Sequence, residues 1–383
     1  MIIKTPYGVS PSIELYISGA AVDYETINAF ELELSENQHD MLVLEISGIP
    51  PKAITEYWGK PVRLEFRTGA NFHHSFYGYV EDIRPFSFTG FGLVNRSPFQ
   101  TARIVCMGAS YNMRGSTSRH WFGYRVSSIA KEIGHKHRFS VDAPSDEYVD
   151  DTLVQTNESD WQFLVRYANS LGYKVNSHGT HLHIYRPDSA LSRQSSYHVL
   201  STLISKQADI DAAPGNIMEF SGSFSRRNID GDYKESEIAV IGKDNSLYNL
   251  RSSTLSNGNG SNRFPNRMDD YADNVAQGNR RLKQEDRSSY DYYADARVIG
   301  VAGCVPGGVV LVDQYASDFD GFWYVQSVKH IVNSRAYVTE LRLAKNKNTE
   351  MVFDGTAPFQ PPPKPYYDFD QWVSTKARFN EYQ

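Results

Sequence analysis

Six short strand-like runs fill the first 110 residues, and they constrain the fold of this chain more than any other feature of its sequence. Each run is enriched in β-branched or aromatic residues, and Gly, Pro or Asn commonly lies between one run and the next. The runs are IELYISG, AFELELS, MLVLEIS, PVRLEFRTG, FYGYVEDI and TARIVCMG. Strands at such short spacing predict a small antiparallel β-barrel or sandwich over residues 1–110.

Helical spacing of apolar residues begins only after this β region. Residues 124–133, YRVSSIAKEI, carry apolar side chains at helical spacing, and Gly134 follows as the expected end of the helix. The stretch 156–175, TNESDWQFLVRYANSLGYKV, predicts a second amphipathic helix that Asn157 caps and Gly172 ends. Its apolar stripe consists of Trp161, Leu164, Val165, Ala168 and Leu171.

A predicted hairpin, YKVNS and THLHIY, completes an α+β domain over residues 111–195. It contains His178, His181 and His183, the most metal-like cluster of the chain. Alternation along a strand places His181 and His183 on one face, so both imidazoles could bind one cation. The alternative is a solvated hairpin face without an ion. The sequence favours that alternative, because no nearby carboxylate completes the set, and we predict no metal site.

Strand-like sequence patterns return in the second half of the chain. Residues 196–240 and 295–346 predict a second β-barrel domain, and residues 241–294 a loop-plus-helix insertion within it. The insertion's helix is expected at about 268–287, where Asp residues precede the apolar repeat and Arg and Lys follow it. Residues 347–383 are rich in Pro and aromatic residues and predict an extended C-terminal arm.

One internal echo connects the two β regions. GKPVRLEFRTG followed by FYGYVEDI resembles PGGVVLVDQYA followed by GFWYVQSV. In each pair, an apolar strand precedes an aromatic-rich strand that contains Tyr-Val. The echo suggests a duplicated β domain.

No motif indicates catalysis or cofactor binding. The chain has no Walker A, GxGxxG, HExxH or GxSxG pattern, and Cys106 and Cys304 lie too far apart to indicate a disulfide framework or a Cys-based zinc site. We therefore predict no enzyme, no catalytic residues and no cofactor. The net charge of −6 argues against a dedicated nucleic-acid binder. Neither a signal peptide nor a long apolar window is evident, so we expect synthesis in a cytoplasm and no membrane span.

The order of these elements, with two motifs, resembles the phage late-control gene-D and baseplate hub family, whose relatives include the hub part of type VI secretion spike proteins. The first motif is a polar start, an aromatic/Leu helix and a glycine: Asn157, Glu158, Ser159, Asp160, Trp161, Phe163, Leu164 and Gly172. The second motif closes the chain's β region: Pro306-Gly307, Tyr324-Val325, Val328, His330 and the strand TELRL. The resemblance covers about residues 1 to 345.

The resemblance implies an α+β, mainly β fold: two related small β-barrel domains with an α+β domain between them and a helix-containing insertion. It implies a homotrimeric, pseudo-six-fold ring that joins a tail tube or distal tail protein to a central spike. DNA or effector would pass through the ring's channel only as cargo. A mildly acidic channel lining would let DNA slide. The tape-measure protein is a further candidate partner. The spike is expected to be another chain, and the location the virion tail baseplate or tip, after assembly in the host cytoplasm.

Two other function classes remain open at this point. A tail-associated cell-wall hydrolase would need a convergent Glu/Asp pair or a zinc triad, and a receptor- or glycan-binding tail module would need an exposed aromatic patch. If the chain is a hub, the arm from Pro361 to Trp372 is expected to lie along a neighbouring chain.

Overall fold

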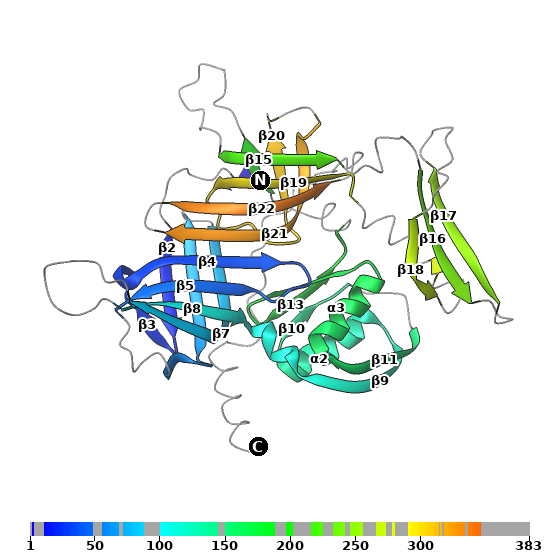
Figure 1. Ribbon diagram of the computed structural model, residues 1–383, viewed down its shortest axis with the longest axis horizontal. Coiled ribbons are helices and arrows are strands. Elements are labelled where there is room, and N and C mark those ends of the chain that lie inside the picture. Colours follow the sequence, from blue (N-terminus) through cyan, green and yellow to red (C-terminus); the bar gives the residue numbers. More distant parts are fainter. Residues whose placement is uncertain are drawn as a thin grey trace, which may run out of the picture.

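Where the structure describes the chain, it is mainly β, with two helices of more than two turns, α2 (Val126–His137) and α3 (Asp160–Ser170) (Figure 1). The computed structural model describes residues 2–3, 11–48, 56–68, 72–87, 100–144, 150–187, 197–201, 216–224, 233–241, 246–255, 266–272, 278–279, 290–313, 315, 318–333 and 336–345. The expected α+β, mainly β class is confirmed. Among these residues, no helix is both long and apolar enough to cross a membrane.

The first β unit contains the six strands that the sequence predicts. They are β2 (Ser12–Ile17), β4 (Ile27–Ser35), β5 (Met41–Ser47), β6 (Pro61–Thr68), β7 (Phe72–Ser87) and β8 (Gln100–Gly108). Their pairing order is β2-β6-β7-β8-β5-β4, with every neighbouring pair antiparallel, and β3 (Ala20–Val22) extends the β2 edge. Alternate side chains such as Phe30, Leu32 and Leu34 are buried in its core, which is the period of two that a one-sided sheet requires.

The second β unit is built from strands of the chain's second half. They are β14 (Tyr197–Ser201), β15 (Ile217–Phe224), β19 (Tyr292–Ile299), β20 (Val309–Asp313), β21 (Gly321–Asn333) and β22 (Tyr337–Lys345). Their pairing order is β14-β20-β21-β22-β19-β15. Trp323 and Leu343 are fully buried in the core of this unit.

The two units repeat one strand plan. If the six strands of each unit are numbered along the chain, both units pair in the order 1-4-5-6-3-2. The bulges coincide as well: one follows Val80 in β7 and Val325 in β21, and another follows Ile27 in β4 and Ile217 in β15. The first pair differs in direction, because β2 and β6 are antiparallel whereas β14 and β20 are parallel. The echo of two strand pairs in the sequence is thus part of a six-strand repeat.

The two units are joined edge to edge by β4 and β21, which lie side by side in Figure 1. The antiparallel register runs from Ala29 opposite Asn333 to Ser35 opposite Ser327. In place of two separately closed barrels, the described strands therefore form one open 14-stranded sheet. The reason is that β21 is 13 residues long, so its first half pairs with β20 while its second half offers an edge to β4.

The α+β unit lies between the two β units in the chain. Its strands are β9 (Ser116–Tyr124), β10 (Ser140–Asp142), β11 (Asp150–Ser159), β12 (Lys174–His178) and β13 (His181–Tyr185). Helices α2 and α3 lie between the β9–β11 ribbon and the β10-β13-β12 sheet (Figure 1). The core between these layers includes Trp121, Phe163 and Leu164, so the predicted amphipathic helix does pack inward.

Two expected helix signals are corrected. Helix α2 does not end at Gly134 but at His137, with Arg138 in the left-handed region at φ 62°. Gly134 lies against Val141, where a β-carbon would clash, so it serves packing and not capping. The start of α3 is capped by Ser159 and not by Asn157: Ser159 and Gln162 form a capping box. Gly172, at φ 76°, does follow the end of α3, as predicted.

The insertion is also partly different from its prediction. Its described strands are β16 (Tyr233–Ile241), β17 (Leu247–Leu255) and β18 (Asn266–Ala272), which form a separate three-stranded sheet. The helix expected at about 268–287 is wrong over β18, because parallel pairing with β16 overrides the local helix signal. Residues 280–287 and the whole C-terminal arm, 347–383, lie outside the described residues.

Candidate functional site

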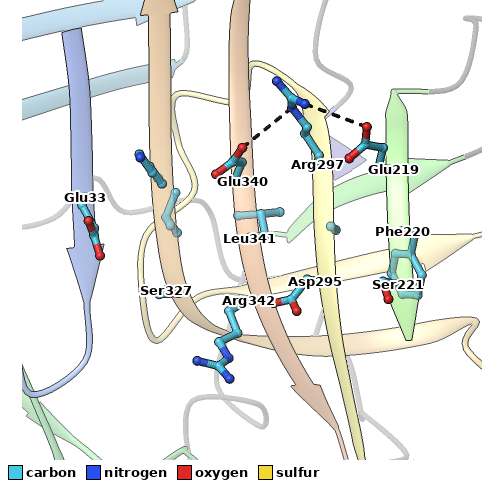
Figure 2. A pocket seen from close by; sticks show the side chains of 13 residues that line it. Glu33, Glu219, Phe220, Ser221, Asp295, Arg297, Ser327, Glu340, Leu341 and Arg342 are labelled. Atoms are coloured by element: carbon cyan, nitrogen blue, oxygen red, sulfur yellow. Dashed lines mark ion pairs between the residues drawn. The ribbon is translucent and has the colours of Figure 1, made fainter. Parts of the chain in front are cut away.

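A charged hollow of about 480 Å³ lies on the sheet where the two β units meet (Figure 2). Strands β4, β21, β22, β19 and β15 each contribute to its lining. The charged residues are Glu33, Glu219, Asp295, Glu340, Arg297, Lys329 and Arg342. They occur here because side chains alternate along each strand, so that Val328 and Leu341 bury their side chains on the core side of the same sheet.

Ion pairs link the strands across this hollow. Arg297 lies 3.9 Å from Glu219 and 3.8 Å from Glu340, and Figure 2 shows it reaching toward both carboxylates. At the joint, Lys329 lies 2.9 Å from Glu31 on β4, and its pKa is raised because it donates a hydrogen bond to that carboxylate. All these groups are partly exposed, so each pair contributes little stability. The described residues that line the hollow include no His or Cys.

A buried polar network connects all three units near the hairpin. Tyr185 donates a hydrogen bond to Glu36 at 2.7 Å, and Tyr324 donates one to Tyr185 at 3.2 Å. Burial raises the pKa of Glu36 to about 7. Gly307 lies at φ 83°, and a β-carbon there would be 2.7 Å from the ring of Tyr185. Residues 307 and 324 of the second sequence motif thus build the contact between the second β unit and the hairpin.

The first sequence motif also has a structural role. The side chain of Asp160 is buried, and it accepts hydrogen bonds from Lys136 at 2.6 Å, from His137 at 2.7 Å and from Gln155 at 2.9 Å. Burial alone would raise the pKa of Asp160, but the hydrogen bonds from these groups hold it below its usual range. The carboxylate therefore ties α2 and β11 to the start of α3.

The predicted histidine cluster is divided between two places. His178 contacts His74, with ring centroids 4.8 Å apart, and His74 in turn lies 5.4 Å from His330. His74 and His330 are buried, and burial lowers the pKa of His74 and of His178, in the latter to about 4. His74 and His178 are therefore neutral, and with His330 they pack between the units. Sequence reasoning could not find this contact, because it joins three distant strands.

His181 and His183 do not belong to this buried group of rings and lie next to the carboxylate of Asp142. Nδ1 of His183 is 2.9 Å from Oδ2 of Asp142, and one ligand atom of each of Asp142, His181 and His183 lies within 4.8 Å of the others. Hydrogen bonding to His183 lowers the pKa of Asp142. Asp142 could not be predicted as a neighbour of these histidines, because it lies on β10, a three-residue strand that pairs with β13.

Solved structures with this fold are phage tail proteins and a secretion component. A tail protein from Neisseria meningitidis matches with a TM-score of 0.64 at 14% identity, over 88% of this chain and 97% of that chain. The 43 kDa tail protein of prophage MuSo2 from Shewanella oneidensis matches with a TM-score of 0.63 at 14% identity, over 88% and 99%. A type VI secretion component from E. coli, itself similar to the T4 bacteriophage tail proteins gp27 and gp5, matches with 0.56 at 10% identity, over 91% and 79%. The chain therefore has the fold of phage tail proteins.

Comparison of the sequence with protein-family models identifies a different family. The model of the Alg8 N-terminal domain matches residues 100–334, more than half of the chain, so the chain belongs to the family that this model describes. That family is unrelated to the gene-D hub family that the motifs resemble. No curated protein matches the sequence.

Proposed function

We propose that the chain is a structural hub protein at the baseplate or tail tip of a phage tail or a tail-like injection machine. Three copies would form a ring of six similar β units that joins a tail tube to a central spike and encloses a channel. The single observation that carries this proposal is the repeated strand plan, together with the β4–β21 joint that already connects two repeats within one chain.

The repeat predicts where copies would meet. By position relative to the bulges, β15 corresponds to β4, with Phe220 at the place of Phe30, and β7 corresponds to β21, with Tyr79 at the place of Tyr324. Among the described strands, β15 pairs only with β19, and the ladder between β6 and β7 stops at Tyr79. Val80 still exchanges backbone hydrogen bonds with Gly59 and Lys60. Among the described residues, β7 beyond Val80 and the outer side of β15 are thus the edges that correspond to the two edges of the internal joint.

Pairing β15 of one copy with β7 of the next would repeat the internal joint between chains. Such a head-to-tail contact generates a closed ring when the rotation closes, and it uses edges that would otherwise remain open to aggregation. Trp58 lies beside the β7 edge: it is 68% exposed, and its indole N–H donates to the carbonyl oxygen of Glu81. An exposed Trp is typical of a surface that a partner covers. The number three comes from the resemblance to the hub family.

The charged hollow fits the wall of such a channel. Its lining carries four carboxylates against three cations, a mixed surface with a slight acidic excess. Such a wall would repel phosphate weakly and bind it nowhere tightly, which suits DNA or effector as passing cargo. The proposed partners are a tail tube or distal tail protein, a central spike and the tape-measure protein, and the proposed location is the virion tail. Assay of the purified protein on peptidoglycan separates this proposal from the hydrolase alternative, whose zinc triad Asp142, His181 and His183 could supply.

A disulfide experiment tests the joint between copies. Within the chain, Glu33 lies opposite Lys329, and the repeat places Ser223 opposite Arg84 of the next copy. Directly opposed residues of antiparallel strands have Cα atoms about 4.5–5.5 Å apart, which suits a disulfide. The double variant Arg84→Cys/Ser223→Cys should form covalent dimers and trimers on oxidation, with no species beyond three chains.

Two controls make the result specific. The variant Glu33→Cys/Lys329→Cys should form a disulfide inside one chain, without any change in mass. The variant Arg84→Cys/Glu219→Cys is out of register by about 13 Å along β15 and should remain uncrosslinked. Equal crosslinking of both intermolecular pairs, or only monomers from the in-register pair, would refute the proposed joint.

A further inference from the structure

A second feature of the α+β unit lies away from the joint, on the β10-β13-β12 sheet. In the parallel register of β10 and β13, Ser140 lies opposite His181 and Asp142 lies opposite His183. Residues two apart on a strand share a face, so Asp142, His181 and His183 meet on one side of the sheet. One ligand atom of each lies within 4.8 Å of the other two.

These residues supply a donor set that divalent transition metals use. Two imidazoles and one carboxylate, completed by water, bind zinc and other first-row ions in proteins. Tetrahedral zinc with bonds of about 2.1 Å holds its ligand atoms about 3.4 Å apart, so the largest separation in the set, within 4.8 Å, needs to close by at most about 1.4 Å. The side chains of Asp142 and His183 are 61% and 43% exposed, and they are free to make this adjustment.

Both rings are already oriented by neighbours. The hydroxyl of Ser140 lies 2.8 Å from Nδ1 of His181, and the ring of His183 stacks on Tyr185 at a centroid distance of 4.9 Å. Tyr185 is itself held by the hydrogen bond to Glu36. Outer contacts of this kind fix the orientation of ligating histidines and raise metal affinity.

We infer that Asp142, His181 and His183 bind one divalent first-row transition-metal ion. The ion would clamp the short strand β10 to the β12–β13 hairpin. The objection from sequence, that no carboxylate accompanies the histidines, is removed by the pairing that brings Asp142 to them. His178 lies opposite His181 but contacts His74, and it belongs to the buried group between the units.

The probe for this site is zinc alone. The full chain, stripped with a chelator, should bind one equivalent of zinc in calorimetry, and zinc should raise its melting temperature. His181→Ala, His183→Ala and Asp142→Asn should each weaken zinc binding at least tenfold. His120→Ala, on the exposed strand β9, is the matched control and should bind as the native chain does.

The inference would be overturned by a native chain that binds no zinc, which would leave Asp142 and His183 as an ion pair only. It would also be overturned by a His181→Ala/His183→Ala variant that binds zinc as well as the native chain. Asp142→Asn guards against misfolding as a cause of lost binding. It is exposed and nearly the same shape, so its circular dichroism should match that of the native chain while zinc binding falls. Zinc binding unchanged in this variant would also contradict the assignment.

Discussion

Replacing Glu36 by Gln should make the protein more stable at pH 8 and leave its stability at pH 5 nearly unchanged. The carboxyl group of Glu36 accepts a hydrogen bond from Tyr185, which is only 6% exposed, at the meeting point of the three units. Burial raises its pKa from 4.5 to about 7. The folded protein therefore holds a proton on Glu36 over a pH range in which the unfolded chain has released it.

The sign and size of the effect follow from proton linkage. Between pH 4.5 and pH 7 the Glu36 side chain binds more protons in the folded state than in the unfolded state, so its contribution to the free energy of unfolding falls as pH rises. The full loss is about 3 kcal/mol, since each pH unit of this range contributes about 1.4 kcal/mol. Gln cannot ionise, and its amide oxygen can still accept from Tyr185. The variant should therefore avoid this loss.

Urea unfolding at pH 5, 6, 7 and 8, followed by tryptophan fluorescence, measures the effect. The free energy of unfolding of Glu36→Gln, relative to that of the native chain, should rise from pH 5 to pH 8 by up to about 3 kcal/mol. Glu25→Gln, an exposed carboxylate at the short helical turn η1 (Tyr24–Thr26), is the control and should leave the profile unchanged. If Glu36→Gln keeps the native pH dependence, or is less stable than the native chain at pH 8, the assignment of a buried proton to Glu36 is wrong.

Three further substitutions test the local packing. Gly134→Ala should destabilise the protein by about 1 to 3 kcal/mol, because its methyl group meets Val141; adding Val141→Ala should restore most of the loss in thermal melts. Gly307→Ala should cost about 1 to 3 kcal/mol, because it adds a side chain at φ 83° against the ring of Tyr185; a neutral result in urea unfolding would contradict the close packing. Ser159→Ala should cost about 1 kcal/mol through loss of the capping box, and an unchanged midpoint would show that the cap contributes nothing.

Local signals in the sequence were reliable where the local backbone alone decides the outcome. Gly172 follows the end of α3 because a backbone position at φ 76° favours glycine. Gly134 led to a wrong helix end because tertiary packing, not capping, requires a glycine there: it lies inside α2 against Val141. The helix expected over β18 was wrong for the same kind of reason. Asp269 and Asp270 indicate a helix start locally, but the parallel pairing with β16 makes this segment a strand.

The candidate sites were harder to predict than the strands. The echo of two strand pairs predicted the duplication, but the edge contact of β4 with β21 depends on how the repeats meet in space. The histidines of HGTHLH could be recognised as a cluster from the sequence. Asp142 lies next to them only because the three-residue strand β10 pairs with β13. His330 was noted as part of a motif, yet its proximity to His74 required the folded sheet.

In the proposed assembly, three copies of this chain surround one channel. A three-dimensional reconstruction of tail tips that contain the protein measures this directly. The account predicts three copies around the tail axis, six similar β units in one ring, and β15 of each copy paired with β7 of the next. A single copy away from the axis, or a ring whose copies meet without these two strands in contact, would contradict it.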